Sequence, residues 1–244
     1  MGSLDQFAEN QTLALLRAGP SPVRLAELTL KIGLRADSEM KLAQINGPAV
    51  ACRAGCSHCC HHQFVTAIVP EVLRLAATIR ATYSEERLAG LQERIAAYLE
   101  IVRATPGPER LSTVKATCPI LEEELCGAFE ARPLACRRHN SVDVEACIRY
   151  RSGERKVPAL ANNEQIRVGQ SLLSGWALGL RRLRLQEAIV ELVPALDIAL
   201  RNPDADERYL AGEPLFDSVV VAGYDPGPIR RALKARSGLG VPLD

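Results

Sequence analysis

Aromatic residues make up only 4% of this 244-residue chain, so its core must consist mainly of Leu, Ala, Val and Ile. That composition favours helices over sheets. Neither sign of charge is in excess: 30 Lys and Arg stand against 29 Asp and Glu, a formal net charge of +1. A chain so balanced has no broad electrostatic footprint for nucleic acid or for an acidic membrane. No apolar run approaches the ~18 residues that a membrane span requires. We therefore expect neither nucleic acid nor a membrane among its partners.

The N-terminal segment lacks the basic stretch and following apolar stretch of a secretory signal. Nucleotide-binding loops are missing too, because none of the 17 glycines falls in a G-x-G-x-x-G or G-K-S/T pattern. Hydrophobic residues make up 47% and charged residues 24%, which is ordinary for a globular protein and excludes disorder as the main state. We predict a cytoplasmic protein, in a compartment that keeps thiols reduced.

Cysteine is confined to one part of the chain. All eight cysteines lie between residues 52 and 147, in two groups. The first group has the spacing Cys-x3-Cys-x2-Cys-Cys, and the second has gaps of seven, nine and ten residues. In a reducing compartment such clusters more often bind metal than form structural disulfides. The predicted metal ligands are Cys52, Cys56, Cys59, Cys60, Cys118, Cys126, Cys136 and Cys147.

Two kinds of centre suit these ligands. Four thiolates complete a tetrahedral zinc site, and four also hold an iron–sulfur cluster such as 4Fe-4S. The thiols could form two centres, or one shared centre with some to spare. Because adjacent side chains usually point apart, we expect Cys59 and Cys60 to serve different centres or to bridge two metals. Disulfides would need an oxidising compartment, and inert buried thiols would not be confined to one segment. We favour an iron–sulfur cluster over Zn²⁺, since no histidine has regular zinc-finger spacing.

The histidines and several arginines lie in the same segment. A histidine could supply a nitrogen ligand, but with eight thiols available we expect the rings beside the centre or in solvent. Arginines could offset the negative charge of the thiolates and donate hydrogen bonds to sulfur, although any one of them is also a plausible surface charge. The residues concerned are His58, His61, His62, His139, Arg53, Arg132, Arg137 and Arg138. Pro133 is predicted to hold an extended or turn geometry that could turn Cys136 inward.

Outside the cysteine segment, apolar residues recur at helical spacing. The predicted helices cover residues 5–18, 22–45, 70–83, 84–102, 164–200 and 228–237. Pro194 is expected to kink or divide the long helix. Trp176 is predicted to be a core residue, and Gly175-x3-Gly179 to allow close helix packing. Asp204 is expected near a further helix start.

The predicted fold is all-α, with helical hairpins around an irregular cysteine-rich segment. Residues 109–160 show little periodicity, so a metal is the obvious source of their order. The acidic run Glu122–Glu124 within it is expected to be a solvated loop. We divide the chain into N-terminal helices (1–45), a cysteine-cluster metal-binding domain (46–160) and a C-terminal helical segment (161–244), packed as one globular unit.

The two cysteine groups resemble those of the YkgJ-type cysteine-cluster proteins. The resemblance covers roughly residues 50–150. It rests on Cys-Arg-Ala-Gly-Cys-Ser-His-Cys-Cys-His from residue 52, on Val65-Thr66 and Pro70-Glu71, on Cys118-Pro-Ile-Leu, and on the segment from Cys126 to Arg137. These proteins are described as zinc- or iron-chelating domains, and the flagellin lysine N-methylases contain a related cluster. The resemblance implies a metal centre built from these cysteines without fixing an activity.

Three functions follow from these observations. The favoured one is a metal-binding protein with a structural or redox role, which could also bind a protein partner. The second is a methyltransferase-like or radical-type enzyme acting on a protein side chain, since Cys52-x3-Cys56-x2-Cys59 matches the cluster triplet of radical S-adenosylmethionine enzymes. The third is Cu(I) storage or delivery, which would spread cysteines along helices. No residue is singled out as catalytic.

Overall fold

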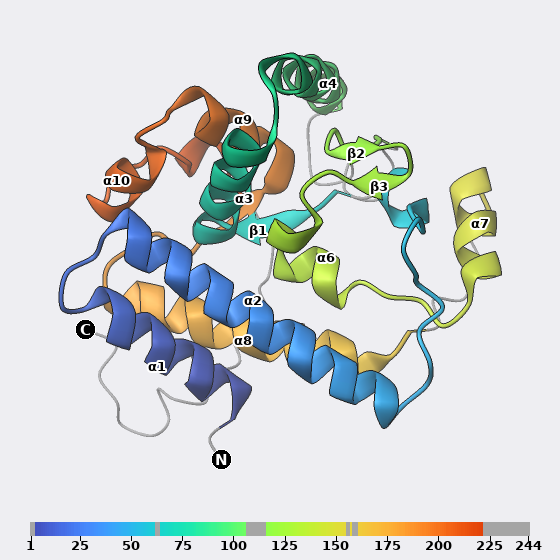
Figure 1. The fold of residues 1–244 in the computed structure, drawn as a ribbon, viewed down its shortest axis with the longest axis horizontal. Coiled ribbons are helices and arrows are strands. Elements are labelled where there is room, and N and C mark those ends of the chain that lie inside the picture. Colours follow the sequence, from blue (N-terminus) through green and yellow to red (C-terminus); the bar gives the residue numbers. More distant parts are fainter. Residues whose placement is uncertain (1–2, 62–63, 106–115, 155–156, 158–160, 222–244) are drawn as a thin grey trace.

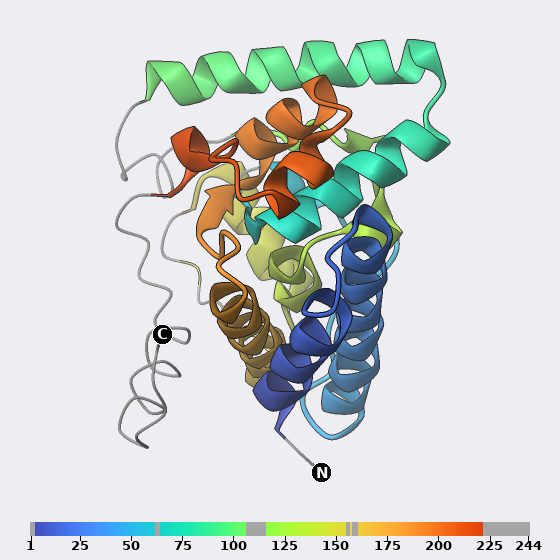
Figure 2. The ribbon, with the colours of Figure 1, turned by 90° about the vertical axis from the view of Figure 1, so that its left-hand side faces the viewer.

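The computed structural model describes residues 3–61, 64–105, 116–154, 157 and 161–221. It is mostly helical, which confirms the predicted all-α class, with two small sheets in the described part. Helices α1 (Leu4–Leu16), α2 (Pro22–Ile45) and α8 (Asn163–Arg182) pack together in one layer (Figure 1). Helices α3 (Val69–Thr82), α9 (Leu192–Arg201) and α10 (Ala205–Leu210) form a second group, and α4 (Glu85–Ala104) lies across the far end (Figure 2). Within the described ranges, no helix is long and apolar enough to cross a membrane.

The long helices begin where the sequence supplies a capping side chain. The hydroxyl of Ser21 accepts a hydrogen bond from the backbone N–H of Arg24 at the start of α2, and Ser84 does the same for Arg87 in α4. Asn162 caps α8 in the same way. Such caps satisfy backbone donors that the first helical turn leaves unpaired. Both predicted helices are present as α3 and α4, with Ser84 as the N-cap of α4, but α4 packs on α9 and not along α3, so the predicted helical hairpin is wrong.

Two glycines let α1 approach α8 closely. A Cβ at Gly175 would overlap the carbonyl oxygen of Asp5, and one at Gly179 would lie 2.5 Å from Cβ of Thr12. Trp176, between these glycines, is only 1% exposed. The predictions of glycine packing and of a core tryptophan are both confirmed.

The predicted helix over residues 164–200 is wrong in its middle. Helix α8 ends at Arg182, and the chain then forms strand β4 (Ile189–Glu191) before α9. Strand β4 pairs antiparallel with β1 (Thr66–Ile68). Pro194 lies in the first turn of α9, where proline is tolerated, so it does not cause the break. A short apolar run fits a buried strand as well as a helix, and spacing alone cannot separate the two.

The cysteine segment contains short elements instead of one irregular loop. They are the 3-10 helices η1 (His58–His61) and η2 (Phe129–Ala131), strands β2 (Leu121–Glu122) and β3 (Leu125–Cys126), and helices α6 (Leu134–Arg138) and α7 (Val144–Ser152). Helix α6 packs on α8 and α2, so this segment shares a hydrophobic core with the flanking helices. After α10, which starts beside Asp204 as expected, comes η3 (Asp217–Val219). The predicted helix near 228–237 lies outside the described residues.

Candidate metal centre

The first cysteine group lies on a tight turn followed by η1. Gly55 has φ +80°, a backbone conformation that favours glycine, and the Cys56 N–H donates to the carbonyl of Arg53. The Cys60 N–H donates to the carbonyl of Ser57 at 2.7 Å, which closes the turn of η1. The short spacing of these cysteines is therefore folded into about one turn of backbone, as expected.

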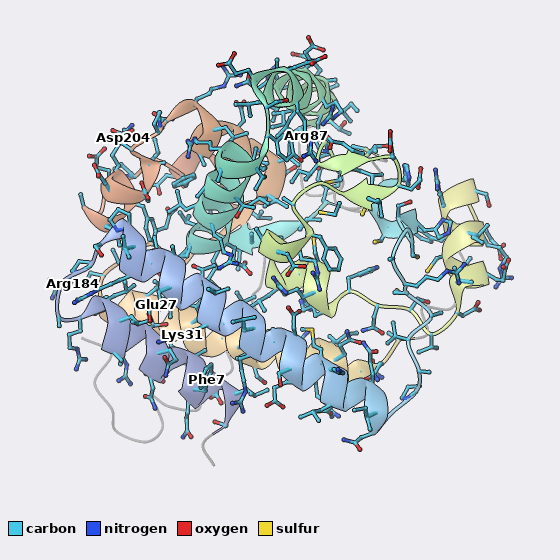
Figure 3. The ribbon with its side chains drawn as sticks, viewed as in Figure 1. Phe7, Glu27, Lys31, Arg87, Arg184 and Asp204 are labelled. Atoms are coloured by element: carbon cyan, nitrogen blue, oxygen red, sulfur yellow. The ribbon has the colours of Figure 1, made fainter. Side chains whose placement is uncertain are left out.

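The second group reaches the first through backbone contacts and helix packing. The Cys118 N–H donates to the carbonyl of Cys60 at 2.7 Å, and the Ala51 N–H donates to the carbonyl of Ser141 at 2.8 Å. Cys126 lies on β3, Cys136 on α6 and Cys147 on α7, which packs against η1. Sulfur atoms of this region are visible between the β2–β3 hairpin and α7 (Figure 3). The two groups, up to 95 positions apart in sequence, thus meet on one side of the molecule.

Every cysteine of the chain is described, and none is in a disulfide. Cys52 is exposed, and the other seven are partly buried. The absence of disulfides among the eight cysteines leaves all eight sulfurs available to a metal.

Four of these thiols form a set in which burial and the charges of neighbouring thiolates raise the pKa values. The pKa of Cys118 is raised to about 11, and that of Cys136 well above its ordinary value, in both cases mainly by burial. Burial also raises the pKa of Cys126. In all three, the negative charge of Cys59 adds to the shift. We call Cys59, Cys118, Cys126 and Cys136 the inner set.

A second set lies nearer the solvent. Burial raises the pKa of Cys52, a backbone hydrogen bond at Ser141 lowers it, and the charges of Cys56, Cys59 and Cys147 raise it further. We call Cys52, Cys56 and Cys147 the outer set. The two sets meet at Cys59, whose pKa is raised first by a hydrogen bond with the Cys60 thiol and then by burial. The raised pKa values of Cys52, Cys59, Cys118, Cys126 and Cys136 mean that these five thiols stay protonated until a cation stabilises their thiolates.

The donor chemistry of this region fits a thiolate-held metal. Within the parts of the chain that the structure describes, no three His, Cys, Asp or Glu side chains are already placed to ligate one ion. One buried polar atom nevertheless lacks a partner beside the thiols: Nδ1 of His58, in η1 next to Cys59. A thiolate or a metal ligand placed nearby would satisfy this atom, which otherwise costs free energy.

The histidines divide into different roles. Nε2 of His61 lies 3.2 Å from Oε2 of Glu124, and its Nδ1 lies 3.4 Å from the hydroxyl of Thr117. Both ring nitrogens of His61 therefore have protein partners, which favours the expected place beside the centre over a ligand role. His139 is the C-cap of α6. His62 lies outside the described residues.

The prediction that Glu122–Glu124 are a solvated loop is confirmed for Glu123 and Glu124, which are exposed, and is wrong for Glu122, which is partly buried in β2. Glu122 pairs with Arg87 and Arg94, each at 2.6 Å. Glu124 accepts a hydrogen bond from the hydroxyl of Ser57. The run forms the tip of the β2–β3 hairpin, whose partners come from other parts of the chain. Ser57, Thr117 and Glu124 were not predicted as functional residues, because in the sequence only their position beside the cysteines marks them.

The arginines act mainly in structure. Arg132 and Arg137 both pair with Asp37 on α2, and Arg137 also donates to the carbonyls of Arg132 and Glu130. These contacts fasten α6 to α2. The positive charge of Arg132 lowers the pKa of Cys126, against the larger effect of burial, so the expected charge compensation holds for this one pair.

The sequence predictions also concerned Pro133 and two further arginines, Arg53 and Arg138. Arg132 and Pro133 both have extended backbone, with ψ of 140° and 162°, as predicted. Arg53 is exposed, which is the surface alternative, and Nε of Arg138 is buried without a hydrogen-bond partner. Neither of these two arginines has a contact that links it to a sulfur.

Residues 51–153 match the CxxCxxCC family model, described as "Putative zinc- or iron-chelating domain". The matched segment contains all eight cysteines and begins one residue before Cys52. No curated protein and no solved structure matches the chain. The match confirms the expected family and supports metal binding by this segment.

Proposed function

Residues 51–153 belong to the CxxCxxCC family of zinc- or iron-chelating domains, and from this premise we propose that the eight cysteines hold two metal centres. The observation that carries the proposal is the convergence of two thiol sets on η1. Burial and neighbouring thiolate charges raise the pKa values of Cys52, Cys118, Cys126 and Cys136, and a bound cation would offset this cost of ionisation. We favour iron–sulfur clusters over zinc ions, with a structural or redox role.

The inner centre would use Cys59, Cys118, Cys126 and Cys136. The thiolate charge of Cys59 acts on each of the other three, so this set is coupled through one residue. The outer centre would use Cys52, Cys56 and Cys147, with Cys60 as the fourth ligand. Cys60 is adjacent to Cys59 and completes the second set of four thiolates. This division assigns the two neighbouring cysteines to different centres.

Iron–sulfur chemistry suits a ligand set made of sulfur alone. Each cluster takes four cysteine thiolates, and eight thiols supply two such sets. When bound, a cluster would supply one-electron transfer. The chain's own residues bury the inner set, and the charge of Arg132 favours the thiolate of Cys126. Loading would release protons from the thiols and draw their sulfurs together, so metal binding is coupled to local ordering.

We further propose that the protein works in the cytoplasm. Eight free thiols, four of them in a buried and mutually repelling set, need a reducing compartment to reach a metal before they oxidise. The exposed Cys52 is the thiol most open to oxidation by position.

Two single substitutions test the division of ligands on anaerobically purified protein. Cys52→Ser lies at the exposed edge of the outer set, and Cys118→Ser removes an inner ligand. Each variant is expected to retain about half of the wild-type iron and sulfide, since four cysteines hold one cluster. Far-UV circular dichroism checks that each variant is folded. Full metal content in Cys52→Ser, or complete loss in both variants, would overturn the two-centre division.

A further inference from the structure

We propose that Glu124 is a positioning residue, whose carboxylate connects the two cysteine groups and holds them ready for metal. This inference rests on the proposed function and extends it to a residue that is not itself a ligand. Glu124 lies at the tip of the β2–β3 hairpin, between Cys118 and Cys126 in sequence. Its shortest contacts are with Ser57 and His61 of the first group.

The contacts of Glu124 alternate with the proposed ligands. Its Oε2 accepts a hydrogen bond from Ser57, which is 3% exposed and lies between Cys56 and Cys59. The same oxygen lies 3.2 Å from Nε2 of His61, the residue after Cys60. One carboxylate oxygen therefore fixes both ends of the segment that carries Cys59 and Cys60.

The network continues into the second group and towards α7. Nδ1 of His61 lies 3.4 Å from the hydroxyl of Thr117, the residue before Cys118. Nη1 of Arg151, four residues after Cys147 in α7, lies 3.8 Å from Oε2 of Glu124. Elements carrying ligands of both sets thus converge on this carboxylate. Hydrogen bonds of this kind beside a metal site orient its ligands and are needed for tight binding.

The backbone at Glu124 supports a role for its side chain. Strands β2 and β3 are joined by a two-residue turn, and its residues Glu123 and Glu124 have φ of +50° and +61°. Asn and Gly are the residues that favour such a turn, and glutamate is not among them. A hairpin needed only for its fold would be better served by Asn-Gly. When another residue type would remove the backbone strain, the strained residue is typically kept for the contacts of its side chain.

Glu123 provides a matched control. It shares the turn and the left-handed backbone, is exposed, and lies one residue from Glu124. The contacts with Ser57 and His61 belong to Glu124 alone. A substitution at Glu123 therefore changes the charge of the hairpin tip by the same amount without breaking the connection.

The test measures Zn²⁺ affinity of the reduced, metal-free full-length chain, by competition with a chromophoric chelator. Glu124→Ala and Glu124→Gln are expected to weaken Zn²⁺ binding by about 10-fold or more, the range typical of residues that support metal ligands. Glu123→Ala should bind within about twofold of the wild type. Ser57→Ala should weaken binding too, and combining it with Glu124→Ala should add less than the two separate losses, because both break one hydrogen bond.

A second variant separates the side chain from the turn. Replacing both turn residues, Glu123→Asn with Glu124→Gly, relieves the backbone and should leave urea unfolding of the metal-free protein unchanged or shifted to higher urea. Zn²⁺ binding should still weaken by about 10-fold, because the carboxylate is gone. Wild-type affinity in this variant, or equal weakening by Glu123→Ala and Glu124→Ala, would overturn the positioning role. A wild-type chain that binds no Zn²⁺ and no iron would overturn the proposed function itself.

Discussion

At the scale of single residues, Glu71 links the start of α3 to the helix that carries Cys136. Its side chain is 4% exposed and accepts hydrogen bonds from the backbone N–H groups of Ile68, at 3.2 Å, and of Leu134, at 2.6 Å. Burial raises the pKa of Glu71 to about 7, although these two hydrogen bonds and the charge of Arg137 lower it. The sequence predicts an acid at this helix start, but not its contact with α6.

This raised pKa predicts a pH dependence of stability. An unfolded Glu ionises near pH 4.5, whereas Glu71 in the folded protein keeps its proton to about pH 7. The folded state therefore binds the proton more tightly, and the free energy of unfolding falls as pH rises from 4.5 to 7, by about 3 kcal/mol at most. We expect Glu71→Gln to remove that dependence. The amide can accept only one of the two N–H bonds, so it should also destabilise by about 1–3 kcal/mol.

Urea unfolding of both proteins at pH 5 and pH 8 measures this effect. The comparison between wild type and variant cancels the contribution of every other titrating group, because these groups are the same in both proteins. The same pH dependence in the two proteins would refute the role of Glu71.

At the scale of helices and strands, elements set by local sequence were predictable and elements set by distant pairing were not. Helices α2 and α4 begin at serines that cap their own first turn. Strand β4 exists because Ile189–Glu191 finds β1, more than 120 residues earlier in the chain. No residue near position 190 in the sequence belongs to that partner strand, so the apolar spacing of this segment led to the prediction of a helix.

The contact between α1 and α8 gives a prediction at this scale. Gly175→Ala would place a methyl group against the carbonyl of Asp5, and the two helices must separate. We expect a loss of about 1–3 kcal/mol in the free energy of unfolding, as for other overpacked cores. Gly90→Ala on α4 is the matched control, since its new Cβ would meet only the end of the Arg94 side chain at 3.5 Å.

The control should unfold at the same or higher urea concentration, because alanine favours a helix by about 1 kcal/mol over glycine. Equal stability of the two variants would mean that α1 and α8 do not pack as closely as the structure places them.

At the scale of the whole molecule, the sequence predicts which cysteines are candidate ligands but not how they are grouped. Confinement of eight cysteines to one segment was enough to predict a metal-binding region and its family. The division into inner and outer sets depends on the hydrogen bond from Cys118 to Cys60 and on the packing of α7 against η1. Both join parts of the chain more than 50 residues apart, and the spacing of the cysteines in the sequence does not reveal such contacts.

We also expect metal binding and folding to be coupled. The inner set includes Cys118 before β2, Cys126 on β3 and Cys136 on α6, in a segment that shares a core with α2 and α8. Loading this set should stabilise the whole protein, because a ligand that binds only the folded state raises the free energy of unfolding.

The most direct test is the iron, acid-labile sulfide and zinc content of the wild-type protein purified without oxygen, with a visible spectrum before and after reduction. We expect iron with matching sulfide and a brown colour that bleaches on reduction. Colourless protein with stoichiometric zinc and no sulfide would contradict the iron–sulfur assignment. Protein that holds neither metal would contradict the central claim that these cysteines form a metal centre.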